Sequence, residues 1–153
     1  MNTRKLLTST AVSLALGLAL PMPASATNND AATCSNKTLK GVYQFATSGY
    51  NIVNGTAVPK AIIETLVFDG QGNVETPFIS LAVNGNIILP PVGSPGYYTV
   101  ESNCTGTLTF GDGITFTLQV RPSGKEVKML QTNPNTVMQG TAEKVLPLKA
   151  WQK

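Results

Sequence analysis

Short turn signals of the Asn-Gly and Asp-Gly type divide this chain into segments. Such pairs favour two-residue β-hairpins, because both central residues of the tight turn need a positive φ. Links this short join strands that are neighbours along the chain, so the sequence predicts a run of antiparallel hairpins. The pairs lie at Asn54-Gly55, Asn84-Gly85 and Asp112-Gly113, and further turn signals lie at 69–72, 122–124 and 133–135.

The segments between these turns are rich in β-branched and aromatic residues, which favour strands. The segment "ITFTLQVR" alternates apolar with polar side chains, a pattern typical of a strand with one dry and one wet face. Its apolar positions are Ile114, Phe116, Leu118 and Val120. No period of 3.6 residues is visible after residue 26, so we expect an all-β protein.

The apolar run "NIIL" at 86–89 decides the strand count. Merged with the strand that follows the Pro-rich stretch at 90–96, it gives eight strands, and counted separately it gives nine. A meander of this size must protect its edges, and closure into a barrel removes them. We predict an antiparallel meander of about eight strands, closed as an up-and-down barrel. The alternative is a β-sandwich, whose crossovers need longer links.

The first 26 residues are predicted to direct export and not to belong to the fold. A basic start precedes the apolar stretch at 6–20, and Ala24 and Ala26 occupy the small-residue positions before a cleavage site. We therefore predict a signal peptide over 1–26, a single barrel domain over 27–153, and a periplasmic or extracellular location in a bacterium.

Two cysteines, Cys34 and Cys104, lie in the predicted exported domain. Exported proteins usually meet an oxidising compartment, where such a pair forms a disulfide. A redox or nucleophilic thiol is the weaker reading, because the chain has no C-x-x-C motif and no histidine to activate a thiolate. We predict a structural disulfide between the two.

The absence of histidine also narrows the other chemistry. It excludes Ser-His-Asp and Cys-His catalysis and metal sites built on imidazole. Phosphate-loop and dinucleotide motifs are absent as well. The segment "FDGQGNVE" at 68–75 reads as a glycine-rich turn better than as a calcium loop. We expect no metal and no cofactor.

The charge balance bears on the partners. The formal net charge of +3 falls by two when Arg4 and Lys5 leave with the signal peptide. So small a charge offers no general attraction for nucleic acid. The polar face of "ITFTLQVR" also argues against a membrane-embedded barrel. A small apolar ligand or a protein partner is expected instead, and the oligomeric state is left open.

Glu64, in "AIIETLVF", is the candidate for chemistry. Apolar residues lie on both faces of this predicted strand, so the carboxyl can point into the barrel. A buried carboxyl has a raised pKa and can act as a general acid or anchor a ligand. The alternative is a surface glutamate or one paired with a lysine. Tyr43, Met129 and Met138 are further ligand-binding candidates, with core packing as their alternative role.

The segment "TLKGVYQF" at 38–45 resembles the opening strand of calycin (lipocalin)-type barrels, with Tyr43 where those proteins carry tryptophan after G-x. Together with F-D-G-x-G-N and "NCTGTL", it is similar to small exported bacterial proteins of unassigned function and to allene-oxide-cyclase-like barrels. The resemblance implies a barrel and brings no catalytic residue.

Three functions fit these patterns. The first is an exported barrel that binds an apolar or amphipathic small molecule in its interior. The second is a non-catalytic surface or matrix protein that acts through protein contacts. The third is an isomerase or cyclase that uses Glu64 as its acid, and on balance the sequence favours a protein that is not an enzyme.

Overall fold

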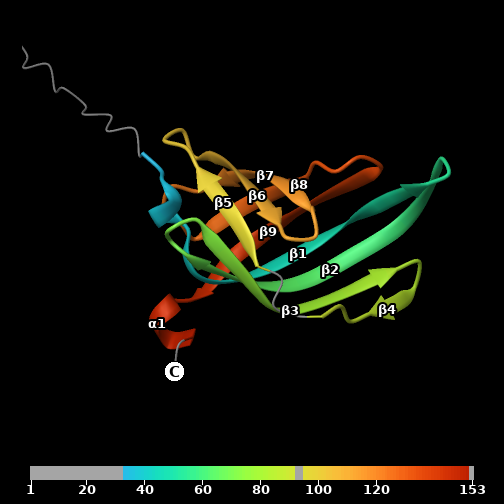
Figure 1. Ribbon diagram of the computed structural model, residues 1–153, viewed down its shortest axis with the longest axis horizontal. Coiled ribbons are helices and arrows are strands. Elements are labelled where there is room, and N and C mark those ends of the chain that lie inside the picture. Colours follow the sequence, from blue (N-terminus) through green and yellow to red (C-terminus); the bar gives the residue numbers. More distant parts are fainter. Residues whose placement is uncertain (1–32, 92–94, 152–153) are drawn as a thin grey trace, which may run out of the picture.

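The computed structural model describes residues 33–91 and 95–151 (Figure 1). The predicted signal peptide at 1–26 and part of the Pro-rich connection at 90–96 lie outside the described residues. Within the described part, strands dominate, with a 3-10 helix η1 (Asn36–Thr38) and a short helix α1 (Leu148–Trp151). The strands are β1 (Lys40–Val53), β2 (Thr56–Asp69), β3 (Asn73–Val83), β4 (Asn86–Ile88), β5 (Gly96–Val100), β6 (Thr105–Phe110), β7 (Thr115–Val120), β8 (Glu126–Gln131) and β9 (Thr136–Leu146).

Eight of these strands close into an antiparallel barrel, as predicted. Neighbours along the chain pair with one another, β9 pairs back to β1, and β3 pairs with β5. The run "NIIL" contains a strand of its own, β4, which within the described residues pairs with β3 alone and lies outside the ring. The β-sandwich alternative is therefore excluded. The order of strands is consistent with calycin-like topology.

Two of the three predicted hairpin turns have the expected geometry. Asn54 and Gly55 have φ angles of 51° and 78°, and Asn84 and Gly85 have φ angles of 49° and 82°. Both residues of each pair thus occupy the left-handed region that a two-residue turn requires. Each pair directly joins two strands, β1 to β2 and β3 to β4.

The third turn differs from the prediction. Only Gly113 has a positive φ, of 85°. Phe110 N–H donates to the oxygen of Ile114, and Gly113 N–H donates to the oxygen of Phe110. The loop therefore holds Gly111 as well as the Asp-Gly pair. A left-handed glycine at the third position completes such a three-residue loop.

Aromatic side chains fill one end of the barrel. The rings of Tyr43 and Tyr98 each meet the ring of Phe68 edge-on, with centroids 5.1 and 5.0 Å away. Tyr98 donates its hydroxyl to the oxygen of Leu39 at 2.7 Å, and Tyr43 donates to the oxygen of Gly124. The hydroxyl groups of both tyrosines are thus hydrogen-bonded beneath η1, and packed side chains close this end of the barrel.

The predicted disulfide Cys34–Cys104 is present at the same end. Beside it, Cys34 N–H donates to the oxygen of Ser102 at 3.2 Å, and Val100 N–H donates to Asn36 Oδ1 at 2.7 Å. The segment that leads into β1 is therefore fixed across the turn between β5 and β6. We call this sealed part of the molecule the closed end.

Candidate functional site at the open end of the barrel

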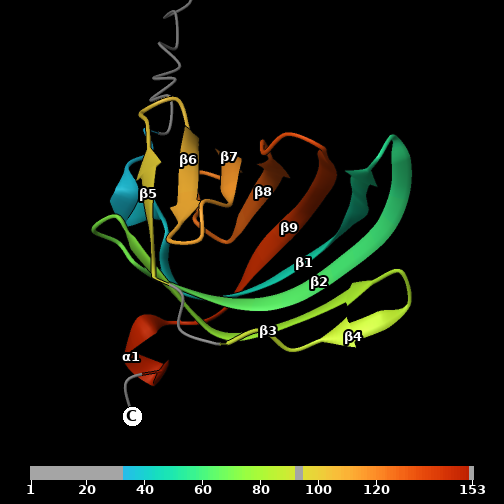
Figure 2. The same ribbon diagram turned by 45° about the vertical axis from the view of Figure 1, so that its right-hand side comes forward.

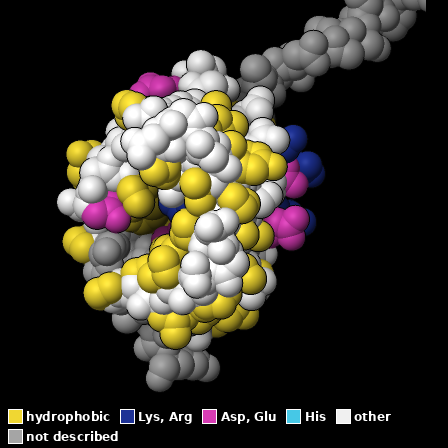
Figure 3. Space-filling view, turned by 90° about the vertical axis from the view of Figure 1, so that its right-hand side faces the viewer, with side chains coloured by type: hydrophobic (Ala, Val, Ile, Leu, Met, Phe, Trp, Pro, Cys, Tyr) yellow, Lys and Arg dark blue, Asp and Glu magenta, His cyan; other side chains and the backbone are white. Residues whose placement is uncertain are grey.

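The opposite end of the barrel is built differently. The β6–β7 and β8–β9 turns lie there, and Asn133 Nδ2 donates to the oxygen of Gly113 at 2.9 Å between them. The strands β1 and β2 have 14 residues each, whereas β6, β7 and β8 have 6, so the long strands project beyond the short ones (Figure 2). Figure 3 shows a hollow at this end with a basic side chain visible inside it. We call it the open end.

Four polar side chains are buried in the barrel just above the aromatic core. Each follows an apolar core residue by two positions in the direction of the open end, so the period-2 alternation of a strand points it inward. The interior thus changes from apolar to polar along its axis. The four are Thr47 next to Phe45, Thr76 next to Val74, Gln131 next to Met129 and Glu64 next to Leu66. Glu64 has the lower number of its pair because β2 runs from the open end to the closed end.

Glu64 is the ionisable member of this group. Its side chain is 5% exposed, and Thr76 donates its hydroxyl to Oε1 at 2.8 Å. Burial raises the pKa of Glu64 from 4.5 to about 7; the Thr76 hydrogen bond lowers it, and the negative charge of Asp112 raises it further. No lysine forms an ion pair with Glu64 among the described residues. The inward placement, and not the surface alternative, is therefore what the structure shows.

Two charged residues lie nearer the rim. Lys60 shares the inward face of β2 with Glu64 and is half-buried. Burial lowers the pKa of Lys60, and the negative charge of Asp112 opposes that shift. Asp112, in the turn between β6 and β7, thus acts on both groups.

Gln131 is a site residue that the sequence analysis missed. Its Nε2 donates to Asn133 Oδ1 at 3.1 Å, but its Oε1 is buried without a hydrogen-bond partner. Buried polar atoms almost always have partners, so the orphaned oxygen is an exception that needs an explanation. The only signal in the sequence is a polar residue that continues the apolar alternation of Val127 and Met129.

Apolar side chains line the wall around Glu64. Ile62 lies between Lys60 and Glu64 on the inward face of β2. Across the ladder, Ile79 pairs with Glu64 and Leu81 pairs with Ile62, so both face inward as well. The open end therefore combines an apolar wall with a few polar groups, the composition typical of small-molecule sites.

The other predicted ligand residues lie deeper. Tyr43 is fully buried in the closed end and uses its hydroxyl there, and Met129 is packed in the same core. These positions match their alternative role in core packing. Met138 is also buried, directly opposite Gly49 on β1. A Cβ at Gly49 would overlap the backbone of residues 137–138, so this close packing needs glycine.

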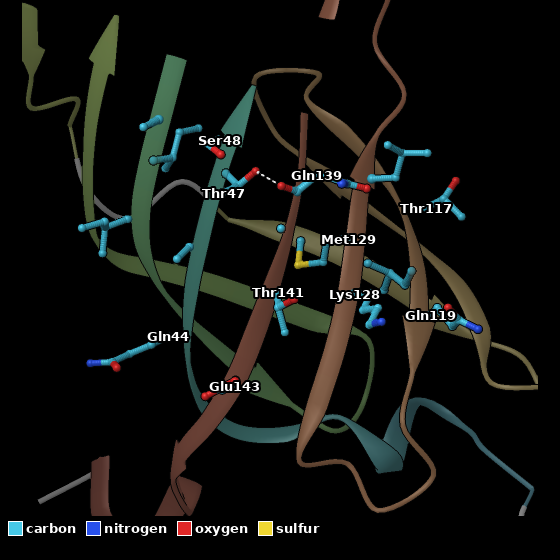
Figure 4. Close-up of a pocket in the computed structure, with 17 residues that line it drawn as sticks. Gln44, Thr47, Ser48, Thr117, Gln119, Lys128, Met129, Gln139, Thr141 and Glu143 are labelled. Atoms are coloured by element: carbon cyan, nitrogen blue, oxygen red, sulfur yellow. Dashed lines mark hydrogen bonds between the residues drawn. The ribbon is translucent and has the colours of Figure 1, made fainter. Parts of the chain in front are cut away.

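A separate groove of about 1050 Å³ runs over the outside of β1, β2, β7, β8 and β9. In Figure 4, Thr47 donates to the oxygen of Gln139 at 2.8 Å behind this groove. Most of the side chains that line the groove are exposed and uncharged. Of the four buried polar residues, Thr47 lines the groove, and Glu64, Thr76 and Gln131 do not. The outward-facing polar ones include Gln44, Ser48, Thr117, Gln119, Gln139 and Thr141.

The turn at 69–72 carries no calcium-like geometry. Asp69 Oδ1 accepts hydrogen bonds from the N–H groups of Gln71, Gly72 and Asn73 at 2.6, 3.1 and 3.0 Å. Desolvation raises the pKa of Asp69, but these bonds and that from the Asn73 side chain outweigh it, so the pKa lies below its ordinary value. The segment is thus a turn, as predicted, and the Asp69 carboxylate caps it.

Comparison with known proteins finds no family model, no curated protein and no solved structure that matches this chain. In the described ranges, no group of three or more Cys, Asp or Glu side chains is placed to hold a metal ion. The helices in those ranges are too short to cross a membrane.

Proposed function

We propose that this protein is an exported barrel that binds a small amphipathic molecule in its open end. The observation that carries the proposal is Glu64: a carboxyl buried in an apolar wall, with one hydrogen bond, at the level where the buried side chains of the barrel change from apolar to polar. Burying such a group costs stability that an apolar side chain would not cost. Retaining it on the inward face of β2, on the side of the open end, suits a ligand anchor.

The proposed location outside the cytoplasm rests on two features. Residues 1–26 have the pattern of a signal peptide. The disulfide Cys34–Cys104 agrees with an oxidising compartment, since cytosolic thiols are kept reduced.

Methyl NMR tests the binding site directly, because adjacent isoleucines report opposite faces of β2. Ile62 faces the interior, and Ile63 faces outward with 61% of its surface exposed. Octanol, a neutral amphiphile, is titrated into the protein. We expect the methyl signals of Ile62 and Ile79 to shift at saturating ligand while those of Ile63 stay in place. Shifts at Ile63 alone, or no shifts, would overturn the proposal.

A second function, protein contact through the outer face, is favoured by a different observation. Large apolar side chains on the outward face of β2, β3, β8 and β9 are well exposed, and such patches often mark interaction surfaces. They include Ile63, Phe78, Leu130 and Val137. Retention of the protein on immobilised copies of itself or on cell-envelope protein, lost in an Ile63→Ser, Val137→Ser variant, would support it.

The isomerase or cyclase hypothesis keeps Glu64 as its acid. No hydrogen bond joins Glu64 to a second ionisable group in the described part of the chain. General acid–base catalysis usually needs a second positioned group, so binding is the better-supported function.

A further inference from the structure

The hydrogen-bonding groups inside the open end are unbalanced. Three of the four buried polar side chains can donate a hydrogen bond whatever the pH, and all three already donate within the protein. Thr47 donates to the oxygen of Gln139, Thr76 donates to Glu64, and Gln131 donates to Asn133. The two hydroxyl donors are therefore engaged, and of the donors on these three side chains only the second N–H of the Gln131 amide is left.

Acceptors, in contrast, are left over. Gln131 Oε1 is buried and has no partner. Glu64 Oε1 accepts from Thr76, and within the described residues no hydrogen bond or ion pair engages Oε2. Of the two, Gln131 Oε1 alone is enclosed without a partner among the described residues, and a donor that reaches it supplies the hydrogen bond that water gave it in the unfolded chain.

The charges near Glu64 also favour a cation. The open end holds two acidic groups, Glu64 and Asp112, and one basic group, Lys60, and the charge of Asp112 acts on the other two. The inward-facing positions of β1 and β3, which flank Glu64, carry no charged residue. When Glu64 is ionised, the open end therefore has a net negative charge, and this attracts cationic ligands and repels anionic ones.

Resting on the ligand binding proposed above, we infer that the open end recognises amphiphiles with a primary ammonium head group, with Glu64 as the counter-charge. An ammonium group has three donors and no acceptor, which is the complement of the interior's surplus. Gln131 Oε1 offers a further acceptor at the same end, and the apolar wall of Ile62, Ile79 and Leu81 takes the alkyl chain.

Binding then involves a proton. The pKa of Glu64 is near 7, so a large share of the protein carries a neutral carboxyl at neutral pH. When the ammonium head group arrives, the carboxyl loses its proton to solvent and pairs with the cation as a carboxylate. Affinity for the amine therefore rises with pH between 5 and 8, in which range an alkylammonium keeps its charge.

Calorimetric titration with octylammonium, octanol and octanoate tests this inference at one chain length. At pH 7.5 we expect octylammonium to bind at least tenfold more tightly than octanoate, with proton release visible as a dependence of the heat on the buffer. Octanoate binding as tightly as octylammonium would overturn the inference and leave amphiphile binding standing. Absence of binding by all three would remove both.

Variants locate the effect. Glu64→Gln removes the charge and keeps the shape, so octylammonium affinity should fall about tenfold and octanol affinity should change less than twofold. Glu143→Gln, the same substitution on the outer face, is the matched control and should leave both unchanged. Gln131→Met should weaken octylammonium more than octanol. A Glu64→Gln variant with unchanged preference for the amine would refute the assignment even if the protein folds normally.

Discussion

Thr76 donates its hydroxyl to Glu64 Oε1 at 2.8 Å across the β2–β3 ladder, and a bulge makes this contact possible. The pairing steps from Thr65 opposite Phe78 to Val67 opposite Glu75, so β3 holds one extra residue there. Pro77 lies in the bulge, where its missing N–H leaves no ladder bond unmade. The bulge keeps Thr76 inward while the next residues change face.

Glu64→Gln is expected to remove a pH dependence of stability. The folded protein binds a proton at Glu64 with a pKa of about 7, against 4.5 for an ordinary glutamate. Its free energy of unfolding should therefore fall as the pH rises from 4.5 to 7, by up to about 3 kcal/mol, and stay low above that. Urea unfolding at pH 5 and pH 8 should show this loss in the wild type and a much smaller one in the variant.

Thr76→Val is expected to raise the pKa of Glu64 above its wild-type value. The hydroxyl donates to the carboxylate and so favours its ionised form, and valine has the same shape without the donor. Carbon-13 NMR titration of the Glu64 carboxyl measures the shift directly. A lower pKa in the variant would show that the hydroxyl does not act on the charge as described.

Cys104→Ser should destabilise the fold and spare the open end. The bridge closes a separation of 70 residues, which in the chain-entropy model contributes about 4 kcal/mol. We expect the melting temperature to fall by roughly 10–20 °C. Reductant should lower the wild type to a similar value and leave the variant unchanged. Ligand affinity should be the same in both, because the disulfide lies at the closed end.

The barrel and the disulfide were predictable because they follow from local chemistry. Turn residues, alternation and two cysteines determine which strands pair and what holds the N-terminal segment. The burial of Glu64 was predictable for a related reason: it is a single carboxylate between apolar runs on both faces of one strand. Its role as a ligand-binding residue is a proposal. The separate strand β4 was left undecided, because the Pro-rich stretch at 90–96 fits either count.

Features that depend on strand offset could not be predicted. Uninterrupted alternation from Val74 and Thr76 would place Phe78 inward, yet the bulge turns it outward, where it is 48% exposed, and brings Ile79 inward. The orphaned oxygen of Gln131 depends on where β8 ends relative to the core. The barrel has one closed and one open end because its strands differ in length. These lengths depend on how far each strand pairs with its neighbours, which the sequence does not state.

Filling the open end should block ligand binding, and neighbouring residues on β3 provide the test. Leu81 faces the interior and pairs with Ile62, whereas Ala82 faces outward and pairs with Ala61. Leu81→Trp places a large ring beside the alkyl site, so we expect octylammonium affinity to fall at least tenfold. Ala82→Trp adds the same ring to the outer face and should leave affinity within twofold. Because both positions are only partly buried, both variants should fold, which circular dichroism checks. Equal loss in the two variants, or loss only in Ala82→Trp, would move the binding site from the interior of the barrel to its outer face.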